Sequence, residues 1–322
     1  MVGPFDEAKA RRTLRLGIGA LWVLDGFLQL QPVMFTRALV VAIWRPMLQG
    51  QPGWLAALIG WSIRLASPHL IAFNVSLALT QVAIGALMLT REGRAARVGL
   101  WWSAVFAAAV WVFGEGMGQV LAPGATILAG APGSALVYLA ASVLLLLPAG
   151  SWRPTAGRPA AAPALLAGGV FVLCGLLQLQ PTFWTSLGLA APFGQAFMMP
   201  QPPLLRQIIG ATSGVVANAP VALNALFSAA LVGCGLLLSF GAAERRPALT
   251  WAALAVLGAV WLLGQDVGML FSGMATDPNS APALALFLGS ALAGHRTVRG
   301  HHATPIHGGS TRPSAGAVAP GR

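Results

Sequence analysis

Charged residues are scarce in this sequence, and cysteines are scarcer still. Only 8% of the 322 residues are Asp, Glu, Lys or Arg, whereas a soluble globular chain carries roughly a quarter. So few charges cannot cover the surface of a soluble fold of this size, which excludes that class. The two cysteines, Cys174 and Cys234, lie in apolar runs and show neither metal-site spacing nor a secreted disulfide pattern.

The sequence also lacks the motifs that would assign a reaction. There is no Walker loop, dinucleotide-binding fingerprint, HExxH pair, CxxC pair or nucleophile elbow. No cofactor is therefore evident from a motif, and we assign no catalytic residue and no metal ligand. Any site must be found from polar residues placed where the apolar background makes them costly.

Apolar residues make up 57% of the chain, and apolar runs of about 20 residues recur along it. Such a run spans the ~30 Å core of a bilayer as a helix. The sequence therefore predicts an all-α integral membrane protein with about eight transmembrane helices. The predicted spans are 14–32, 69–90, 98–121, 134–148, 164–181, 218–240, 247–270 and 282–294.

An internal repeat divides these spans into two sets of four. Residues 24–32 return at 173–181, an offset of 149, and later matches fall at an offset of 150. The later pairs include polar and aromatic residues that chance composition would not align: Asn74 with Asn224, Trp101 with Trp251, Trp111 with Trp261, Thr126 with Thr276, and Pro132 with Pro282. We interpret the chain as two tandem four-helix units, since self-similarity at a fixed period marks a repeated structural unit.

The repeat sets the expected organisation of the chain. The segments are a cytoplasmic N-terminal segment 1–13, a first membrane repeat 14–150, a cytoplasmic linker 151–163, a second membrane repeat 164–294, and a tail 295–322. The long connections 33–68 and 182–217 follow the first span of each repeat. The apolar piece 54–61 is too short to cross a bilayer, so we expect an interfacial or re-entrant helix there.

Positive charge indicates the orientation. With a cytoplasmic N-terminus and eight spans, 15 Lys and Arg residues lie inside and 4 lie outside, which fits the positive-inside rule. We therefore expect a multi-pass protein of the plasma (inner) membrane with both termini cytoplasmic. The two repeats then share one orientation, and their pseudo-twofold axis lies along the membrane normal.

The net charge of +11 does not indicate a nucleic-acid partner, because the basic residues are spread over short loops and form no soluble basic domain. The segment from His295 onward is polar, rich in Gly and Pro, and holds four of the five histidines. We expect a disordered cytoplasmic tail there; metal binding by His295, His301, His302 and His307 is the alternative.

Acids inside a membrane span are costly, so they are candidate functional residues. No basic residue within the spans is an evident partner for them. With the glutamines near the same predicted outer ends they form a candidate polar pocket or proton site: Asp25, Gln29, Gln31, Glu115, Gln119, Gln178, Gln180, Gln265 and Asp266. The alternative is that the amides and acids only hydrogen-bond between helices, with nearby glycines allowing close approach.

Two other features have simple interpretations. Residues 277–279 (Asp-Pro-Asn) predict a turn, with Ser280 capping the last span, although a role as an outer lid is an alternative. Methionines gather on the predicted outer side: Met34, Met47, Met117, Met198, Met199, Met269 and Met274. Thioethers suit Cu(I), but methionine is also an ordinary filler of irregular apolar gaps.

The first span resembles the start of DoxX/DoxD-like membrane proteins. The resemblance is carried by Arg15, Gly19, Trp22, Gly26 and Pro32, and by the Gly-rich second span, basic loop and third span from Gly85 to Leu100. It covers about 80 residues of each repeat and implies a four-helix membrane unit associated with quinone-linked redox chemistry. This chain departs from that family in being duplicated and in lacking a recognisable set of redox ligands.

Three functions from different classes follow. The first is a quinone- or redox-associated accessory subunit with an outward-facing polar pocket, whose partners are the lipid bilayer, redox-enzyme subunits or a second copy of the chain. The second is a transporter of a small solute, a proton or a metal such as copper, which the parallel repeats suggest. The third is a scaffold that assembles other membrane proteins without chemistry of its own.

Overall fold

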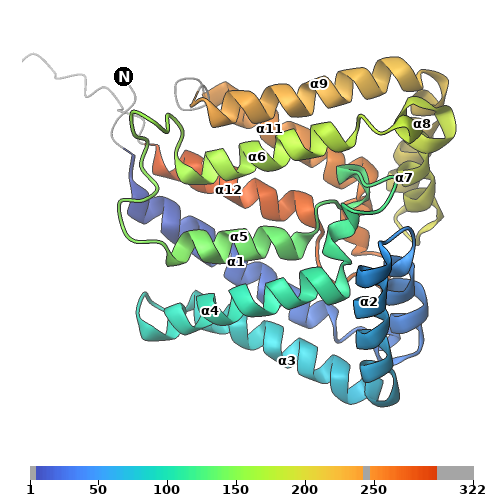
Figure 1. Cartoon of the computed structure of the whole chain (residues 1–322), viewed down its shortest axis with the longest axis horizontal. Helices are drawn as coiled ribbons and strands as arrows, with labels where there is room; N and C mark the ends of the chain where they lie inside the picture. Colours follow the sequence, from blue (N-terminus) through green and yellow to red (C-terminus); the bar gives the residue numbers. More distant parts are fainter. Residues whose placement is uncertain (1–4, 242–246, 296–322) are drawn as a thin grey trace, which may run out of the picture.

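Long helices lie side by side along one axis of the molecule, and shorter helices lie across one end (Figure 1). The computed structural model describes residues 5–241 and 247–295. Within these ranges the chain is helical, and its one β feature is an isolated bridge between Thr155 and Arg158. The all-α class predicted from composition is therefore confirmed.

The N-terminal half holds four long helices and one that crosses them. The long helices are α1 (Glu7–Leu28), α3 (Leu70–Leu89), α4 (Arg94–Ala109) and α5 (Ser134–Leu146). Between α1 and α3 come the short segments η1 (Pro32–Phe35), η2 (Leu39–Trp44), η3 (Arg45–Leu48), helix α2 (Gly53–Ala66) and η4 (Ser67–His69). Segments η5 (Val110–Gly114), η6 (Met117–Gln119) and η7 (Ile127–Ala129) connect α4 to α5.

The C-terminal half follows the same order. Its long helices are α6 (Ala162–Leu177), α9 (Pro220–Ser239), α11 (Pro247–Ala259) and α12 (Ser280–Gly294). Between α6 and α9 come η8 (Pro181–Trp184), α7 (Ser186–Met198) and α8 (Pro203–Asn218). Segments η9 (Val260–Gly264) and η10 (Asp266–Met269) connect α11 to α12.

Four stretches are long and apolar enough to cross a membrane: Gly53–Leu89, Arg94–Gly114, Pro220–Ser239 and Pro247–Gly264. The first of these joins α2 to α3, but the chain bends between them at η4, where His69 leaves helical geometry. Helix α2 then lies across the end of the bundle (Figure 1). The apolar piece 54–61 therefore lies in a helix separate from α3, and its interfacial or re-entrant position stays a prediction.

Glycines let neighbouring helices approach closely in both halves. A Cβ on Gly85 of α3 would lie 2.5 Å from the carbonyl oxygen of Gly19 on α1. In the other half, a Cβ on Gly235 of α9 would lie 2.6 Å from the carbonyl oxygen of Gly168 on α6. Small residues at helix crossings are typical of membrane bundles, in which van der Waals packing drives association. The glycines of the resemblance therefore have a packing role.

The predicted spans 98–121 and 247–270 are wrong in their outer parts. The helices change to wider π-type turns at η5 and η9 and end at Gly114 and Gly264. The next residues, 116–119 and 266–269, all have positive φ between 48° and 68°, so each forms a left-handed turn. A left-handed turn reverses the chain sharply, and one occurs at the same place in each half.

Two glutamines connect the halves reciprocally. The Gln31 amide donates to the carbonyl oxygen of Ala275 at 2.9 Å, and the Gln180 amide donates to that of Ala125 at 3.0 Å. Each amide also donates to a carbonyl three residues earlier in its own chain segment. These two predicted site residues therefore hold the halves together instead of facing a cavity.

The pairing of Pro132 with Pro282 is also wrong. The Trp111 indole donates to the carbonyl oxygen of Pro132, and the Trp261 indole donates to that of Pro278, both at 2.9 Å. Pro278 is therefore the structural counterpart of Pro132, and the connection after Thr126 is four residues longer than the one after Thr276. Helix α12 begins at Ser280, with Asn279 rather than Ser280 as its N-cap.

Candidate functional site

The N-terminal half contains a cavity of about 320 Å³, bounded by α1, α3, α4, α5, η2 and α2. Its walls are mostly apolar and rich in aromatic rings: Trp22, Trp44, Trp61, Phe73, Phe106 and Phe113. The described residues that line it include acids and amides but no Lys, Arg or His. The cavity thus combines an apolar body with a polar region that has no compensating positive charge.

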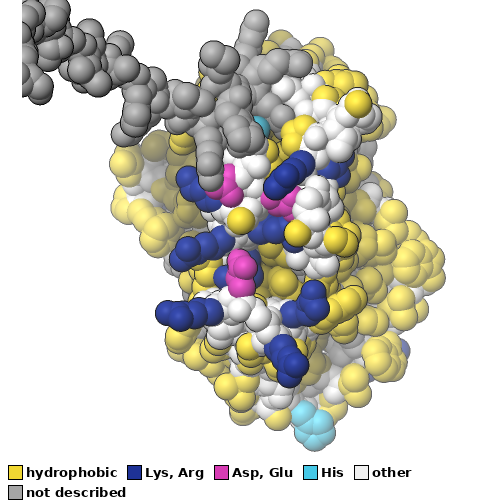
Figure 2. Space-filling view, turned by 90° about the vertical axis from the view of Figure 1, so that its left-hand side faces the viewer, with side chains coloured by type: hydrophobic (Ala, Val, Ile, Leu, Met, Phe, Trp, Pro, Cys, Tyr) yellow, Lys and Arg dark blue, Asp and Glu magenta, His cyan; other side chains and the backbone are white. Residues whose placement is uncertain are grey.

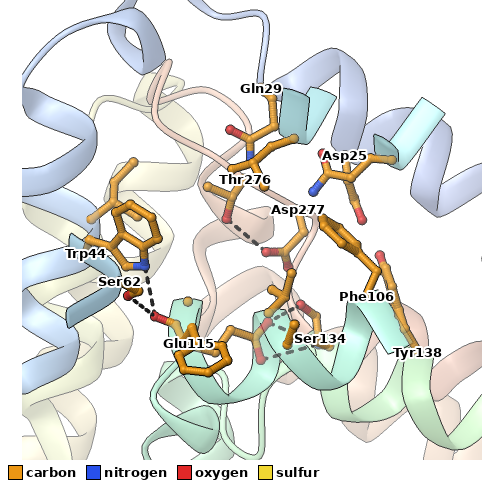
Figure 3. Close-up of a pocket in the computed structure, with 18 of the residues that line it drawn as sticks. Asp25, Gln29, Trp44, Ser62, Phe106, Glu115, Ser134, Tyr138, Thr276 and Asp277 are labelled. Atoms are coloured by element: carbon orange, nitrogen blue, oxygen red, sulfur yellow. Dashed lines mark hydrogen bonds between the residues drawn. The ribbon is translucent and has the colours of Figure 1, made fainter. Parts of the chain in front are cut away.

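Three carboxyl groups mark the polar region (Figure 3). Asp25 comes from α1, Glu115 from the end of η5, and Asp277 from the loop before α12 in the other half. All three line the same cavity, and no basic residue among its described lining offsets them. A ligand that supplies hydrogen-bond donors or positive charge would fit such a lining.

Several buried acceptors in the cavity have no hydrogen-bond partner among the described residues. They are Asp25 Oδ1, Gln29 Oε1 and Gln81 Oε1. The Tyr138 hydroxyl lies beside the Asp25 carboxyl and interacts with it. Asp25 is 2% exposed, and the Tyr138 ring stands edge-on to Trp22 with ring centres 4.7 Å apart. A buried polar group without a partner costs free energy, so these atoms indicate a ligand that donates hydrogen bonds to them.

Glu115 has both a structural and a cavity-facing position. Its Oε1 accepts from the Ser134 hydroxyl at 2.7 Å and from the Ala135 amide at 3.1 Å, at the N-terminus of α5. Exposed amides at a helix N-terminus favour an acceptor there. Helix α5 has 13 residues, about 20 Å of helix, so it is too short to cross a ~30 Å core alone. The helix break at Gly114 brings Glu115 to its start.

The matching position in the other half carries Gln265. The Gln265 amide oxygen accepts from the Ala281 amide at 3.2 Å, and its nitrogen lies 3.0 Å from the Ser280 hydroxyl, at the N-terminus of α12. The nitrogen also donates to the carbonyl oxygen of Ile127 at 2.7 Å. A glutamine thus supports the same turn as Glu115 does, and only the acid adds a charge.

Asp277 is the functional candidate that the sequence pattern did not single out. The turn formed by 277–279 is confirmed, since Asp277 Oδ1 accepts from the Asn279 amide at 2.7 Å. Its other oxygen accepts from the Thr276 hydroxyl at 3.0 Å, and both residues line the cavity (Figure 3). The cavity of the N-terminal half is therefore completed by a loop from the C-terminal half.

No family model, no curated protein and no solved structure matches this chain. The function must therefore be argued from the site itself.

Of the nine predicted site residues, the structure brings three into this cavity: Asp25, Gln29 and Glu115. Gln119 instead donates to the carbonyl oxygen of Met47 at 3.2 Å and holds the left-handed turn against η3. Asp266 lies in the matching turn of the other half, where it is 2% exposed.

Gln178, the counterpart of Gln29, is fully buried, and neither polar atom of its side chain has a partner among the described residues. It lines neither the cavity of the N-terminal half nor the one found in the C-terminal half.

A second cavity of about 310 Å³ occupies the matching place in the C-terminal half. Leu223, Phe227 and Val256 line it where Phe73, Leu77 and Phe106 line the first. The acids are gone: Cys174 stands at the position of Asp25, and Thr212 is the one polar side chain in the lining. The two cavities are thus similar in volume and differ in the polarity of their linings.

The described residues offer no arrangement of side chains that supports the metal-binding hypotheses. Within residues 5–241 and 247–295, no group of three or more His, Cys, Asp or Glu side chains is arranged to hold a metal ion. Among the outer methionines, Met34 is fully buried whereas Met198 is 75% exposed, so these two do not share one environment. Of the tail, only His295 is described; His301, His302 and His307 lie outside the described residues.

Proposed function

We propose that this chain is an eight-span membrane protein made of two tandem four-helix units. The support is local and occurs twice: π-type segments at 110–114 and 260–264, left-handed turns after them, and glycine contacts between the first two long helices of each half. Helices α5, α6 and α12, with 13, 16 and 15 residues, complete the set as short spans that need a locally thinner bilayer or added length from the segments beside them.

We propose further that the end where α1 begins faces the cytoplasm of a plasma-membrane protein. Figure 2 shows this end, where Lys and Arg side chains gather around a few acids while the sides of the molecule are hydrophobic. The positive-inside rule places such an end in the cytoplasm. The acid-lined cavity then opens in the outer half of the membrane, below α2.

Labelling of introduced cysteines tests this orientation. In a variant with Cys174 and Cys234 replaced by alanine, we expect Pro200→Cys to react with an impermeant maleimide added to intact cells, because residue 200 is exposed in the loop between α7 and α8. Ala156→Cys, exposed in the linker at the basic end, should react only after the membrane is permeabilised. The reverse pattern would contradict the proposed topology.

We propose that the cavity binds a lipid-soluble quinol as part of a redox-associated accessory subunit. The observation that carries this is the cluster of unpartnered buried acceptors, Asp25 Oδ1, Gln29 Oε1 and Gln81 Oε1, within aromatic walls. A quinol has a flat apolar ring for such walls and two hydroxyl groups that donate to acceptors. Its oxidised form donates no hydrogen bond, so the lining favours the quinol.

The resemblance to DoxX/DoxD-like proteins supports the same class of ligand. The chain itself supplies a binding site and offers proton acceptors beside the ring. Electron transfer would need a partner enzyme that carries the redox centre, which is why the proposal is an accessory subunit.

Quenching of tryptophan fluorescence tests the proposal. Three of the 11 tryptophans, Trp22, Trp44 and Trp61, line the cavity, so a short-chain quinol should quench a saturable fraction of the emission of the purified protein. We expect the corresponding quinone to bind more weakly, since it cannot donate to the free acceptors. Thr212→Val, in the second cavity, is the matched control and should leave the titration unchanged. Absence of saturable quenching by either form would overturn the proposal.

A second function, transport of a small solute or a proton, is favoured by one observation. The helical segments that continue α4 and α11 break off at Gly114 and Gly264. Broken helices that expose backbone groups to a cavity are typical of transporters. Proton or solute flux in liposomes that falls on combining Glu115→Gln with Asp266→Asn would favour transport over binding alone.

A further inference from the structure

A third cavity lies at the basic end of the molecule and shares no lining residue with the acid-lined one. It has a volume of about 330 Å³ and lies between the first turns of α1 and the loop after α3. Three arginines and one acid line it with two leucines and a threonine: Arg12, Arg15, Leu16, Leu89, Thr90, Arg91 and Glu92. Figure 2 shows the face on which this cavity opens.

Arg15 forms the floor of this cavity and is the unusual member of the set. It is only 7% exposed, and its guanidinium donates to the carbonyl oxygens of Met88 and Thr90 at the end of α3. Positive charge is favourable at a helix C-terminus, so this contact accounts for part of its role. Among the described residues, however, no carboxylate forms an ion pair with Arg12, Arg15 or Arg91.

One arginine at this end, Arg11, is paired with an acid within the chain. Arg11, one residue from Arg12, bonds to Glu7 at 2.7 Å and also donates to two carbonyl oxygens of the segment after α5. Its positive charge and its donors are satisfied within the chain. The cavity arginines lack such a partner, and Glu92 on the rim leaves a net positive charge around the space.

The other half shows that the bundle does not need this arginine for packing. At the offset of 149 that relates α1 to α6, Arg15 corresponds to Ala164, which is 3% exposed. The same position in the fold is therefore filled by a methyl group in one half and by a buried guanidinium in the other. The charge at residue 15 calls for a reason other than helix packing.

We propose that this cavity binds the phosphate of an anionic phospholipid from the cytoplasmic leaflet. Arginine donates to phosphate through two parallel N–H groups, which makes it the preferred residue for such contacts. Leu16 and the 42% exposed Leu89 border the site and provide an apolar surface for the start of the acyl chains. Basic pockets between helices on the cytoplasmic side are suited to anionic headgroups. The inference rests on the proposed orientation in the membrane and is independent of the quinol.

Native mass spectrometry of protein from nanodiscs with equal phosphatidylglycerol and phosphatidylcholine tests this site. We expect the protein to retain phosphatidylglycerol. The double variant Arg12→Gln plus Arg91→Gln should retain it about 30-fold less, since each arginine near a membrane surface contributes about fivefold. Arg94→Gln plus Arg97→Gln is the matched control, because both residues are exposed at the start of α4 and lie outside the cavity.

The arms of the experiment separate the sources of phosphate. The control variant Arg94→Gln plus Arg97→Gln should retain most of the bound phosphatidylglycerol. Millimolar inorganic phosphate should not displace the lipid. Equal losses in the two double variants would show a diffuse charge effect and overturn the site. Displacement by inorganic phosphate, or equal retention of phosphatidylcholine, would overturn the lipid assignment. Arg15 is left intact throughout, so the cap of α3 is kept.

Discussion

Replacing Glu115 with glutamine should weaken quinol binding about fivefold or more while leaving the fold intact. The fold survives because the protein already uses glutamine at the matching position. Gln265 accepts from the Ala281 amide and contacts the Ser280 hydroxyl, as Glu115 does with Ala135 and Ser134. Glu115→Gln can therefore keep the start of α5 in place and change only the charge that faces the cavity.

The binding loss follows from what the ligand must replace. A quinol hydroxyl that loses its acceptor leaves a buried polar group without a partner, which costs about 1–3 kcal/mol, or roughly 5- to 150-fold in affinity. Asp25→Asn and Asp277→Asn should act in the same direction, because both carboxyls line the same cavity. The Asp277 effect has separate value: it would show that a loop of the C-terminal half takes part in a site of the N-terminal half.

Quinol titration followed by tryptophan emission gives the affinities, and thermal unfolding in the same detergent gives the control on folding. We expect Glu115→Gln to unfold within a few degrees of the parent chain. An unchanged dissociation constant in all three acid variants would remove the carboxyl groups from ligand binding. The role of Glu115 would then be limited to capping α5.

The all-helical class with long apolar helices could be predicted from the sequence, and so could the proposed doubling, because each leaves a signal spread over many residues. Scarce charge, apolar runs of about 20 residues and a constant offset do not depend on any single contact. The glycines of α1 and α3 and the asparagines at 74 and 224 are among the residues that carry these distributed signals. Both asparagines donate to the backbone carbonyl of the glutamine that caps the C-terminus of the first long helix of their own half, at 2.7 and 2.9 Å.

The helix breaks at Gly114 and Gly264 left no such signal. Apolar residues continue through both segments, so hydropathy alone extends the spans to residues 121 and 270. The left-handed turns include Met117, Gln119 and Val267 as well as glycines. The positions of the glycines alone therefore do not predict how long these turns are. Tertiary bonds fix the first turn, including the Gln51 amide to the Gly116 carbonyl oxygen at 3.0 Å.

Asp277 was missed for a different reason. Its sequence neighbours give a sufficient local account of it as a turn residue, and more than 250 positions separate it from Asp25. One signal could have indicated it. Aligning Pro132 with Pro278 requires a four-residue gap. With that gap, Asp277 aligns with Ala131, which lies just before α5, the helix whose start Glu115 caps.

The comparison of the two cavities narrows which residues matter for function. Polar lining residues of the first cavity are replaced in the second half by residues that cannot accept hydrogen bonds strongly: Cys174 for Asp25, Leu231 for Gln81 and Leu284 for Tyr138. The shared glycines, prolines and tryptophans belong to the scaffold, since both halves keep them. Under the proposed function, the acids that differ between the halves are the first residues to test, and they line the first cavity.

The scaffold leads to the last prediction, that Gly118→Ala will destabilise the protein by about 3 kcal/mol or more. The cause is overlap, because a Cβ at residue 118 would lie 1.8 Å from the Pro132 carbonyl oxygen. Backbone conformation alone is not the obstacle, since Met117 and Gln119 adopt similar positive φ values. That carbonyl accepts from the Trp111 indole at 2.9 Å, so moving Pro132 also breaks this bond and shifts the start of α5.

Gly114→Ala is the matched control for this prediction. Its new methyl group would have Val110 Cγ1 as nearest neighbour at 3.5 Å, an ordinary contact, and residue 114 lies in a helical segment. Thermal unfolding of both variants in one detergent should show a large fall in the midpoint for Gly118→Ala and a small one for Gly114→Ala. Equal midpoints would mean that the left-handed turn can open without cost. The helix break would then be a flexible joint, and Glu115 would not be held at the start of α5 by the packing of Gly118 against Pro132.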